Sequence, residues 1–329
     1  MKHLLSTADL SRDDAVELLD EAARFLAGLL RVVPADDVTV IGNVADDLVI
    51  HGLHVSPDLD TITYTLADQV DPDRGWGLRD ESWQAMTMLG RYGGIDWFNL
   101  GDRDLGTHLY RTQRLSEGAT LSQVTAEITT AWDLGLRLLP VTDDPLRTRV
   151  TVVDPDTERE VSFQEWFVQR HHDVPVRSVR WTGADEATPA PGVLEALIEA
   201  EAVVIAPSNP IVSIGPLLEV PGVDDALREV RERTVAISPI VAGAALKGPA
   251  DRLMVDLGLE ATVVGVARWY EPYAAALVID EADADLAAEV TAAGPRPVVT
   301  PTVMSSPDVA AALARTTLAA AGVTVEGPA

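Results

Sequence analysis

Residues 38–47 read VTVIGNVADD and join a short run of β-branched and apolar residues to a polar loop with two adjacent aspartates. Such a run, followed directly by a turn, is typical of a parallel strand that is buried on both faces. Helical patterns separate this run from others like it, which predicts an α/β fold with a mostly parallel sheet covered by helices. The other predicted strands are Ala202–Ala206 (AVVIA), Thr234–Ser238 (TVAIS), Ala261–Val266 (ATVVGV), Ala275–Asp280 and Pro297–Thr300 (PVVT).

The stretch 72–133 has few strand signals and several helical patterns. We interpret it as a mainly helical insertion near the carboxyl edge of the sheet. Residues 1–71 and 134–329 are then assigned to one α/β core. The predicted core is therefore formed by two separate stretches of the chain, with the helical insertion between them.

Three further elements are predicted within the core. Thr148–Val153 and Glu160–Phe163 flank a polar turn, which indicates an antiparallel hairpin at an edge. Pro307–Gly322 has alanine-rich helical periodicity and is expected to close the fold.

Composition excludes several classes of protein. The 329 residues include 52 acidic and 25 basic ones, and the resulting net charge of −27 repels polyanions. This excludes a general binder of nucleic acid or anionic membranes. The lack of cysteine excludes a disulfide framework, a thiolate zinc site and a cysteine nucleophile. No apolar run of about 18 residues and no signal peptide is visible, so we expect a cytoplasmic protein.

Two pairs of aspartates follow the first predicted strand closely, Asp46–Asp47 and Asp58 with Asp60. Loops at the carboxyl ends of parallel strands are where α/β proteins bind ligands. Paired carboxylates suit a hard divalent cation such as Mg²⁺, which can bridge phosphate oxygens. The alternative is that such aspartates cap helices and form turns, and it applies equally to Asp102, Asp104, Asp143 and Asp144.

Two segments that follow predicted strands have the character of phosphate-binding loops. In Pro207–Pro216 (PSNPIVSIGP), Ser213 and Gly215 can begin a helix whose backbone N–H groups face an anion. Ser238–Pro249 contains Lys247, one of two lysines in the chain, which suits a phosphate contact or a solvated surface position. The six histidines show no metal-binding spacing such as HExxH, and we expect core or surface roles for them.

Taken together, seven motifs resemble those of the 2-phospho-L-lactate transferase family, in the same order and spacing from about residue 23 to residue 322. They are Asn43–Asp47 (NVADD), Ser56–Thr61 (SPDLDT), Asp71–Gly77 (DPDRGWG), Leu100–His108 (LGDRDLGTH), Phe163–Phe167 (FQEWF), Pro207–Pro216 and Ser238–Pro239. The resemblance implies a Rossmann-like core with an insertion. It also implies a Mg²⁺-dependent homodimer that transfers a phospholactyl or phosphoenolpyruvyl group. The donor would be the guanosine diphosphate ester of that group, the acceptor 8-hydroxy-5-deazariboflavin, and the leaving group GMP, in the synthesis of a deazaflavin coenzyme.

The resemblance also implies roles for particular residues. It places Asp60 and Asn99 on the acceptor, and Asp47 and Asp60 are the catalytic candidates. The predicted metal ligands are Asp46, Asp47, Asp58 and Asp60. The predicted nucleotide-binding residues are Ser208, Asn209, Ser238 and Lys247.

The amino-terminal segment departs from this family. The family opens with a strand and a glycine-rich loop, whereas residues 1–22 contain no glycine and are predicted to be mainly helical. They are similar to the first helix of carbamoyltransferases, with no supporting motif downstream. We therefore expect weakened binding of the donor diphosphate. A non-catalytic nucleotide-binding regulator of the gluconeogenesis-factor type is the alternative function.

Overall fold

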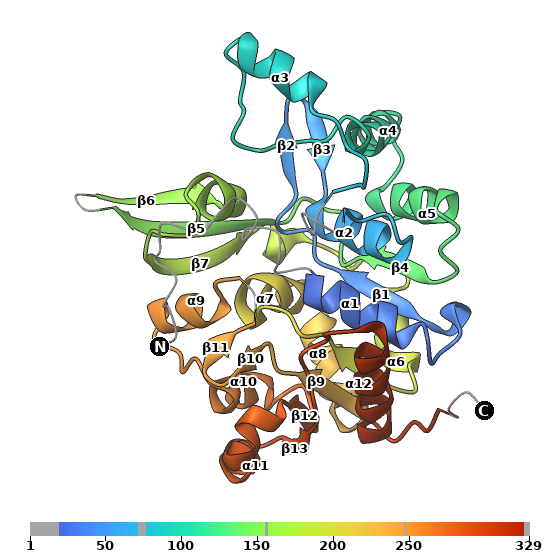
Figure 1. Cartoon of the computed structure of the whole chain (residues 1–329), viewed down its shortest axis with the longest axis vertical. Helices are drawn as coiled ribbons and strands as arrows, with labels where there is room; N and C mark the ends of the chain where they lie inside the picture. The colour runs from blue at the N-terminus through green and yellow to red at the C-terminus, as the bar shows by residue number, and fades with distance from the viewer. Residues whose placement is uncertain (1–19, 72–76, 155–156, 247, 326–329) are drawn as a thin grey trace.

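Four parallel strands form the largest sheet, in the order β13-β12-β9-β8. The computed structural model describes residues 20–71, 77–154, 157–246 and 248–325, and Figure 1 shows this sheet in the lower half of the molecule. All four strands were predicted from the sequence and are confirmed. They are β8 (Val203–Ile205), β9 (Thr234–Ile237), β12 (Ala276–Ile279) and β13 (Arg296–Val299).

The first predicted strand is also confirmed, as β1 (Thr39–Gly42). It pairs in parallel with β4 (Arg137–Pro140), which the sequence did not predict. Within the described residues, these two strands form a sheet of their own. The fold is thus mixed α/β with parallel sheets, as expected.

One predicted strand is wrong. Residues 261–266 instead lead into helix α10 (Val263–Tyr270), whose start is capped by the Thr262 hydroxyl accepting from the Gly265 amide at 3.2 Å. Val263, Val266, Ala267 and Tyr270 are all fully buried and recur at helical spacing. Burial of this face overrides the β propensity of the valines.

The predicted hairpin is confirmed as β5 (Arg147–Asp154) and β6 (Thr157–Ser162), which pair antiparallel. A third strand, β7 (Val176–Thr182), pairs with the other side of β5, so β5 is the central strand of this sheet rather than an edge. Alternate residues of β5 are buried, which is why the strand could be predicted.

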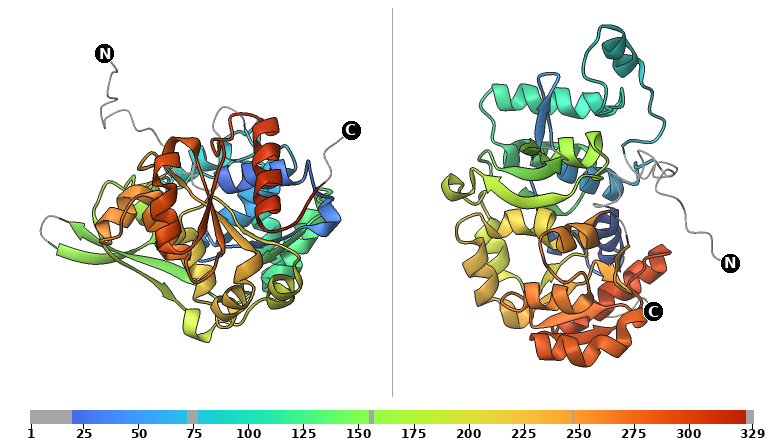
Figure 2. Two further views of the ribbon diagram at one scale, coloured as in Figure 1. Left: turned by 90° about the horizontal axis from the view of Figure 1, so that it is seen from below. Right: turned by 90° about the vertical axis from the view of Figure 1, so that its left-hand side faces the viewer.

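Helices cover the strands. The predicted closing helix is confirmed as α12 (Pro307–Ala320), and it packs along α1 (Asp20–Leu29), as Figure 2 also shows. Residues 1–19, most of the predicted amino-terminal helix, lie outside the described residues. The remaining core helices are α6 (Val193–Glu199), α7 (Gly215–Leu218), α8 (Val223–Glu229), α9 (Ala250–Asp256) and α11 (Ala287–Ala293).

Helices also occupy the predicted insertion, in the upper part of Figure 1. They are α3 (Gln84–Arg91), α4 (Asp104–Ser116) and α5 (Leu121–Ala131). The hairpin of β2 (Leu48–Ile50) and β3 (Leu53–Val55) extends into the same region and β3 contacts α4. Helix α2 (Pro57–Leu66) lies between this region and α1. The domain boundary at residue 72 stays a prediction.

The packing of α1 on α12 generates a stability prediction. A Cβ atom at Gly28 would lie 2.5 Å from the carbonyl carbon of Ala310, a contact that the helix backbone must move to relieve. We expect Gly28→Ala to lower the free energy of unfolding by about 1–3 kcal/mol in a urea titration. Gly90→Ala is the matched control, because that helical glycine has open space around it and should gain up to about 1 kcal/mol. Equal stability of the two variants would contradict the close contact between Gly28 of α1 and Ala310 of α12.

Candidate functional site

The site begins where β1 ends. The side chain of Asn43 accepts from the Ala45 amide at 2.9 Å and donates to Asp46 Oδ2 at 3.1 Å, which fixes the turn NVADD. Asp46 and Asp47 are buried, at 6% and 5% exposure. The β1 strand therefore delivers two adjacent carboxylates into the interior of the protein.

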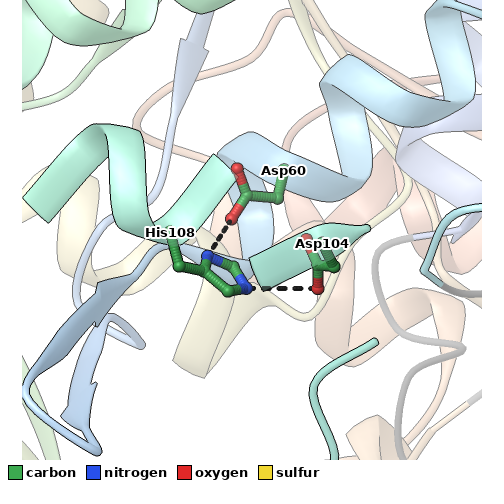
Figure 3. Close-up of side chains that lie close together, drawn as sticks. All are labelled: Asp60, Asp104 and His108. Carbon is green, nitrogen blue, oxygen red and sulfur yellow. Dashed lines mark ion pairs between the residues drawn. The ribbon is translucent and has the colours of Figure 1, made fainter. Parts of the chain in front are cut away.

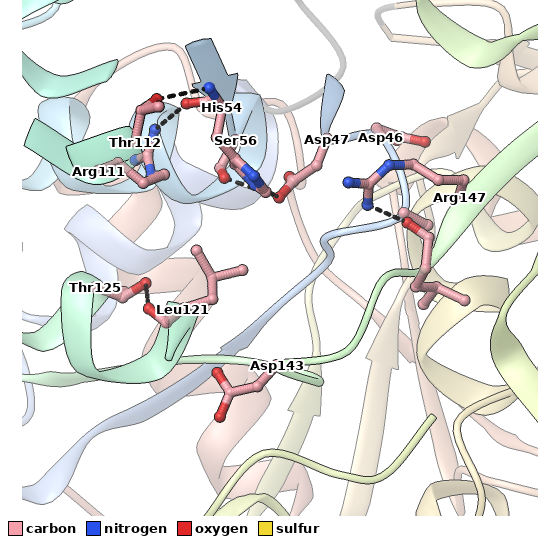
Figure 4. A network of polar contacts seen from close by, with 12 residues as sticks. Asp46, Asp47, His54, Ser56, Arg111, Thr112, Leu121, Thr125, Asp143 and Arg147 are labelled. Atoms are coloured by element: carbon pink, nitrogen blue, oxygen red, sulfur yellow. Dashed lines mark hydrogen bonds and ion pairs between the residues drawn. The ribbon is translucent and has the colours of Figure 1, made fainter. Parts of the chain in front are cut away.

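Asp47 is held by residues of β3 and the turn after it. Its Oδ2 accepts from Ser56 Oγ at 2.8 Å and lies 2.9 Å from His54 Nε2, as drawn in Figure 4. The His54 amide in turn donates to Thr112 Oγ1 on α4 at 2.8 Å. The other oxygens of the pair, Asp46 Oδ1 and Asp47 Oδ1, are buried and have no hydrogen-bond partner. Those orphaned oxygens leave the site with capacity to bind a donor or a cation.

Asp58 and Asp60 lie in the first turn of α2, which has a proline at its first position. Both residues are 5% exposed. A helix amino terminus favours negative charge, which offsets part of the cost of burying them.

The carboxylates perturb one another. Burial, together with the charge of Asp58, raises the pKa of Asp46 well above its usual value. Burial and the charge of Asp47 raise the pKa of Asp58 to about 7. Charge that is crowded and desolvated in this way favours binding of either a proton or a cation.

A second group of side chains comes from α4. The sequence had indicated Asp104 only as part of an acidic pair and assigned no site role to His108 or Arg111. Asp104, His108 and Arg111 lie on one face of that helix, and all three point toward α2. His108 Nε2 lies 3.1 Å from Asp104 Oδ2, and His108 Nδ1 lies 3.7 Å from Asp60 Oδ2 (Figure 3). The hydroxyl of Tyr64 donates to Asp104 Oδ1 at 2.6 Å. The i, i+4, i+7 spacing was the available signal.

Two sets of residues are therefore candidates to hold a metal ion. Ligand atoms of Asp60, Asp104 and His108 lie within 4.8 Å of one another. Both oxygens of Asp60, however, already accept from the buried guanidinium of Arg111. The set Asp46, Asp47 and Asp58 has no such cation and has two unpartnered oxygens. This second set offers only oxygen ligands, the kind that Mg²⁺ prefers, but its ligand atoms do not converge as closely as those of Asp60, Asp104 and His108.

A pocket of about 140 Å³ opens beside these carboxylates. Asp46, Asp58 and Asp60 line it, as does Asn99, the predicted acceptor contact. Its apolar wall contains the rings of Trp97, Phe98, Phe163 and Phe167. A planar aromatic ligand with polar substituents matches such a wall.

The predicted nucleotide-binding residues are found elsewhere. Ser208 and Asn209 line a second, smaller cavity together with Pro239. Ser238 is buried, and its hydroxyl is engaged with the backbone of Ile240. Lys247 lies outside the described residues.

One segment joins the two cavities. The side chain of Asn209 accepts from the Ile211 and Val212 amides and so caps a π-helical turn, Pro210–Ile214. Ser213, in that turn, lines the first pocket. The predicted phosphate-binding loop thus contacts both cavities, and π-helical turns are frequent at functional sites.

The other acidic pairs include clear structural roles. Asp102 accepts from the Gln84 and Ala85 amides at the start of α3. Asp143 accepts from the Ser122 amide at 2.6 Å, and Asp144 from the Thr188 amide at 2.8 Å. Asp102 and Asp143 thus bind amides at helix starts, as the capping alternative expected, whereas Asp144 joins two loops.

These features define an α/β protein with buried carboxylates beside a pocket at the carboxyl end of a parallel strand. The family model "2-phospho-L-lactate transferase CofD" matches residues 22–312. The chain therefore belongs to that family of transferases, as its motifs indicated.

Similar proteins agree with this assignment. The chain is 45% identical over 302 residues to a phosphoenolpyruvate transferase of Kitasatospora aureofaciens, covering 91% of this chain and 94% of that protein. It is 41% identical over 328 residues to a phosphoenolpyruvate transferase of Mycobacterium sp. (strain JLS), covering 99% and 95%.

A solved structure shares the fold. Protein BH3568 from Bacillus halodurans superposes with a TM-score of 0.59 at 17% identity, covering 91% of this chain and 96% of that one. At this identity the likeness concerns the fold alone. In the described part of the chain, every helix is too short or too polar to cross a membrane.

The crowded carboxylates generate the second prediction. In the metal-free protein Asp58 binds a proton more tightly than it does when unfolded, so stability falls as the pH rises from about 4 through about 7. Asp58→Asn removes that charge. At pH 8, in EDTA, we expect the variant to unfold with a free energy at least about 1 kcal/mol above wild type. The difference should shrink at pH 5, where Asp58 is protonated. An Asp58→Asn variant that is less stable than wild type at pH 8 would contradict the proposed repulsion between Asp58 and the neighbouring carboxylates.

Proposed function

We propose that this protein transfers a phosphoenolpyruvyl group from its guanosine diphosphate ester to the ribityl hydroxyl of 8-hydroxy-5-deazariboflavin, releasing GMP. The buried carboxylates beside an aromatic-walled pocket are the observation that carries this proposal. The names of relatives 45% and 41% identical to the chain support phosphoenolpyruvyl as the transferred group. The product would be a precursor of a deazaflavin coenzyme.

The chemistry is a displacement at phosphorus. The acceptor hydroxyl oxygen forms a bond to the phosphorus that carries the enolpyruvyl group, and the bond from that phosphorus to the bridging oxygen breaks. The electron pair leaves with GMP, and the hydroxyl proton passes to a carboxylate. Catalysis of such a step is mainly positioning and charge stabilisation.

Asp46, Asp47 and Asp58 are the residues that would hold Mg²⁺, which when bound neutralises charge on the transferring phosphate. His54 and Ser56 hold Asp47 in place through its Oδ2. The earlier prediction that Asp60 is a further ligand stays open. We assign Asp60 first to the acceptor, because Arg111 occupies its oxygens.

The two cavities suit the two substrates. The deazaflavin would occupy the aromatic-walled pocket, where Asp60 and Asn99 contact it. The guanosine diphosphate ester would extend from Ser208 and Asn209, in the second cavity, toward Ser213 in the first. Ser238 and Lys247 would contribute on the donor side. We further propose a cytoplasmic homodimer.

The expected weakness in donor binding is part of this proposal. It is tested by measuring KM for the guanosine diphosphate ester in this protein and in the Kitasatospora aureofaciens relative under the same conditions. A higher donor KM here, with a similar acceptor KM, would support it. Binding of the donor without any transfer would favour the regulator alternative.

The metal and the aspartates generate the third prediction. Formation of GMP should stop in EDTA and return with Mg²⁺. Asp47→Asn should lower the rate by at least about 100-fold at any Mg²⁺ concentration. The change removes one of the carboxylates that would hold the metal ion while charge develops in the transition state. Asp37→Asn, in the exposed turn Ala35–Asp37, is the matched control and should leave the rate unchanged. Equal rates for both variants would remove Asp47 from the mechanism.

A further inference from the structure

Arg111 is a buried cation that the proposed reaction does not yet use. Its side chain is 2% exposed, and among the described residues no other arginine is buried. Nη1 donates to Asp60 Oδ2 at 3.0 Å and Nη2 donates to Asp60 Oδ1. This two-bond pairing fixes the plane of the Asp60 carboxylate as well as its position.

His108 is oriented by the same guanidinium. Arg111 Nη1 lies 3.4 Å from His108 Nδ1, and because arginine only donates, Nδ1 is the acceptor. The proton of a neutral imidazole then resides on Nε2, which faces Asp104 Oδ2 at 3.1 Å. Asp104 also accepts from Tyr64. His108 Nε2 lies at ion-pair distance from Asp104 but makes no hydrogen bond among the described residues, so the two side chains interact through proximity and charge.

These contacts argue against a metal ion at Asp60, Asp104 and His108. A divalent cation there would sit beside the permanent positive charge of Arg111 and compete with it for Asp60. Burial alone would raise the pKa of Asp104. Its contacts with His108 and Tyr64 outweigh that effect, so the pKa of Asp104 is lowered. Each carboxylate of the group therefore already has a protein partner, Asp60 through Arg111 and Asp104 through Tyr64.

We propose that Arg111 and His108 are positioning residues that hold the Asp60 carboxylate in the orientation in which it accepts a hydrogen bond from the acceptor hydroxyl. The inference rests on the proposed function, because it assigns Asp60 to that substrate. Arg111 takes one lone pair on each oxygen of Asp60, so each oxygen can accept a further hydrogen bond, and Asp60 lines the pocket. Asp104, which accepts from Tyr64, lies 3.1 Å from His108 Nε2, and all three residues line the same pocket.

The test uses Arg111→Lys and His108→Gln in the full chain. Lysine keeps the charge but provides a single point contact, and glutamine keeps polarity without the ring. Arg114→Lys is the matched control. Arg114 lies one turn further along α4, where it pairs with Glu117 and Glu127 outside the pocket.

Transfer is followed as GMP release with varied acceptor, donor and Mg²⁺. A misplaced carboxylate should lower kcat by about 100-fold in Arg111→Lys, with a smaller loss in His108→Gln. The donor KM and the Mg²⁺ concentration for half-maximal rate should not change. Arg114→Lys should match wild type in every parameter.

A second pair of variants separates positioning from folding. Arg111→Met leaves Asp60 buried and unpaired, so its thermal midpoint should fall. Adding Asp60→Asn removes the unpaired charge and should restore the midpoint while transfer stays absent. A double variant that remains unstable would overturn the assignment, because Arg111 would then act through packing alone.

Three other results would overturn it. Wild-type kcat in Arg111→Lys would show that the two-bond geometry is irrelevant. A raised Mg²⁺ requirement in His108→Gln would instead make the group a metal site. Wild-type protein that binds neither deazaflavin nor donor would contradict the proposed function itself, and this assignment would fail with it.

Discussion

The ion pair between Arg111 and Asp60 joins two parts of the chain that are 51 residues apart. It links α4 to α2 in a buried setting where an unpaired charge would be very unfavourable. Because Arg111 also approaches the carbonyl of His54, α4 stabilises both the turn that holds Asp47 and the helix that carries Asp60. The position of α4 therefore determines the shape of the acidic side of the pocket, and any movement of this helix would disturb both sets of carboxylates together.

The remaining carboxylates are an energetic burden on the folded state. Asp46, Asp47 and Asp58 are buried next to one another, and no arginine or lysine pairs with them directly among the described residues. A protein selected for stability alone would replace them by neutral groups. The net charge of −27 has the same sign and cannot help an anionic substrate to bind. We interpret the cluster as a site whose negative charge is neutralised when a cation binds. Most of the other acidic residues are solvated.

The site also depends on two strands of different sheets. The turn after β1 provides carboxylates, and the segment after β8 reaches both cavities through a π-helical turn. Each segment follows the carboxyl end of a strand in a parallel sheet, and Asp46 from the first and Ser213 from the second line the same pocket. This arrangement allows a donor and an acceptor to be bound by separate loops and brought together at the carboxylates.

The sequence by itself determined five parallel strands, the hairpin of β5 and β6, the acidic turn after β1 and the family, because short apolar runs and motif spacing are local properties. It did not distinguish the valine-rich start of α10 from a strand, because only burial on one helical face decides between them. Nor did it identify Arg111 and His108. Their spacing from Asp104 is visible on one helix, but their partner Asp60 comes from a different helix. Only the tertiary structure brings these charges within hydrogen-bonding distance, where low solvent access makes their pairing decisive.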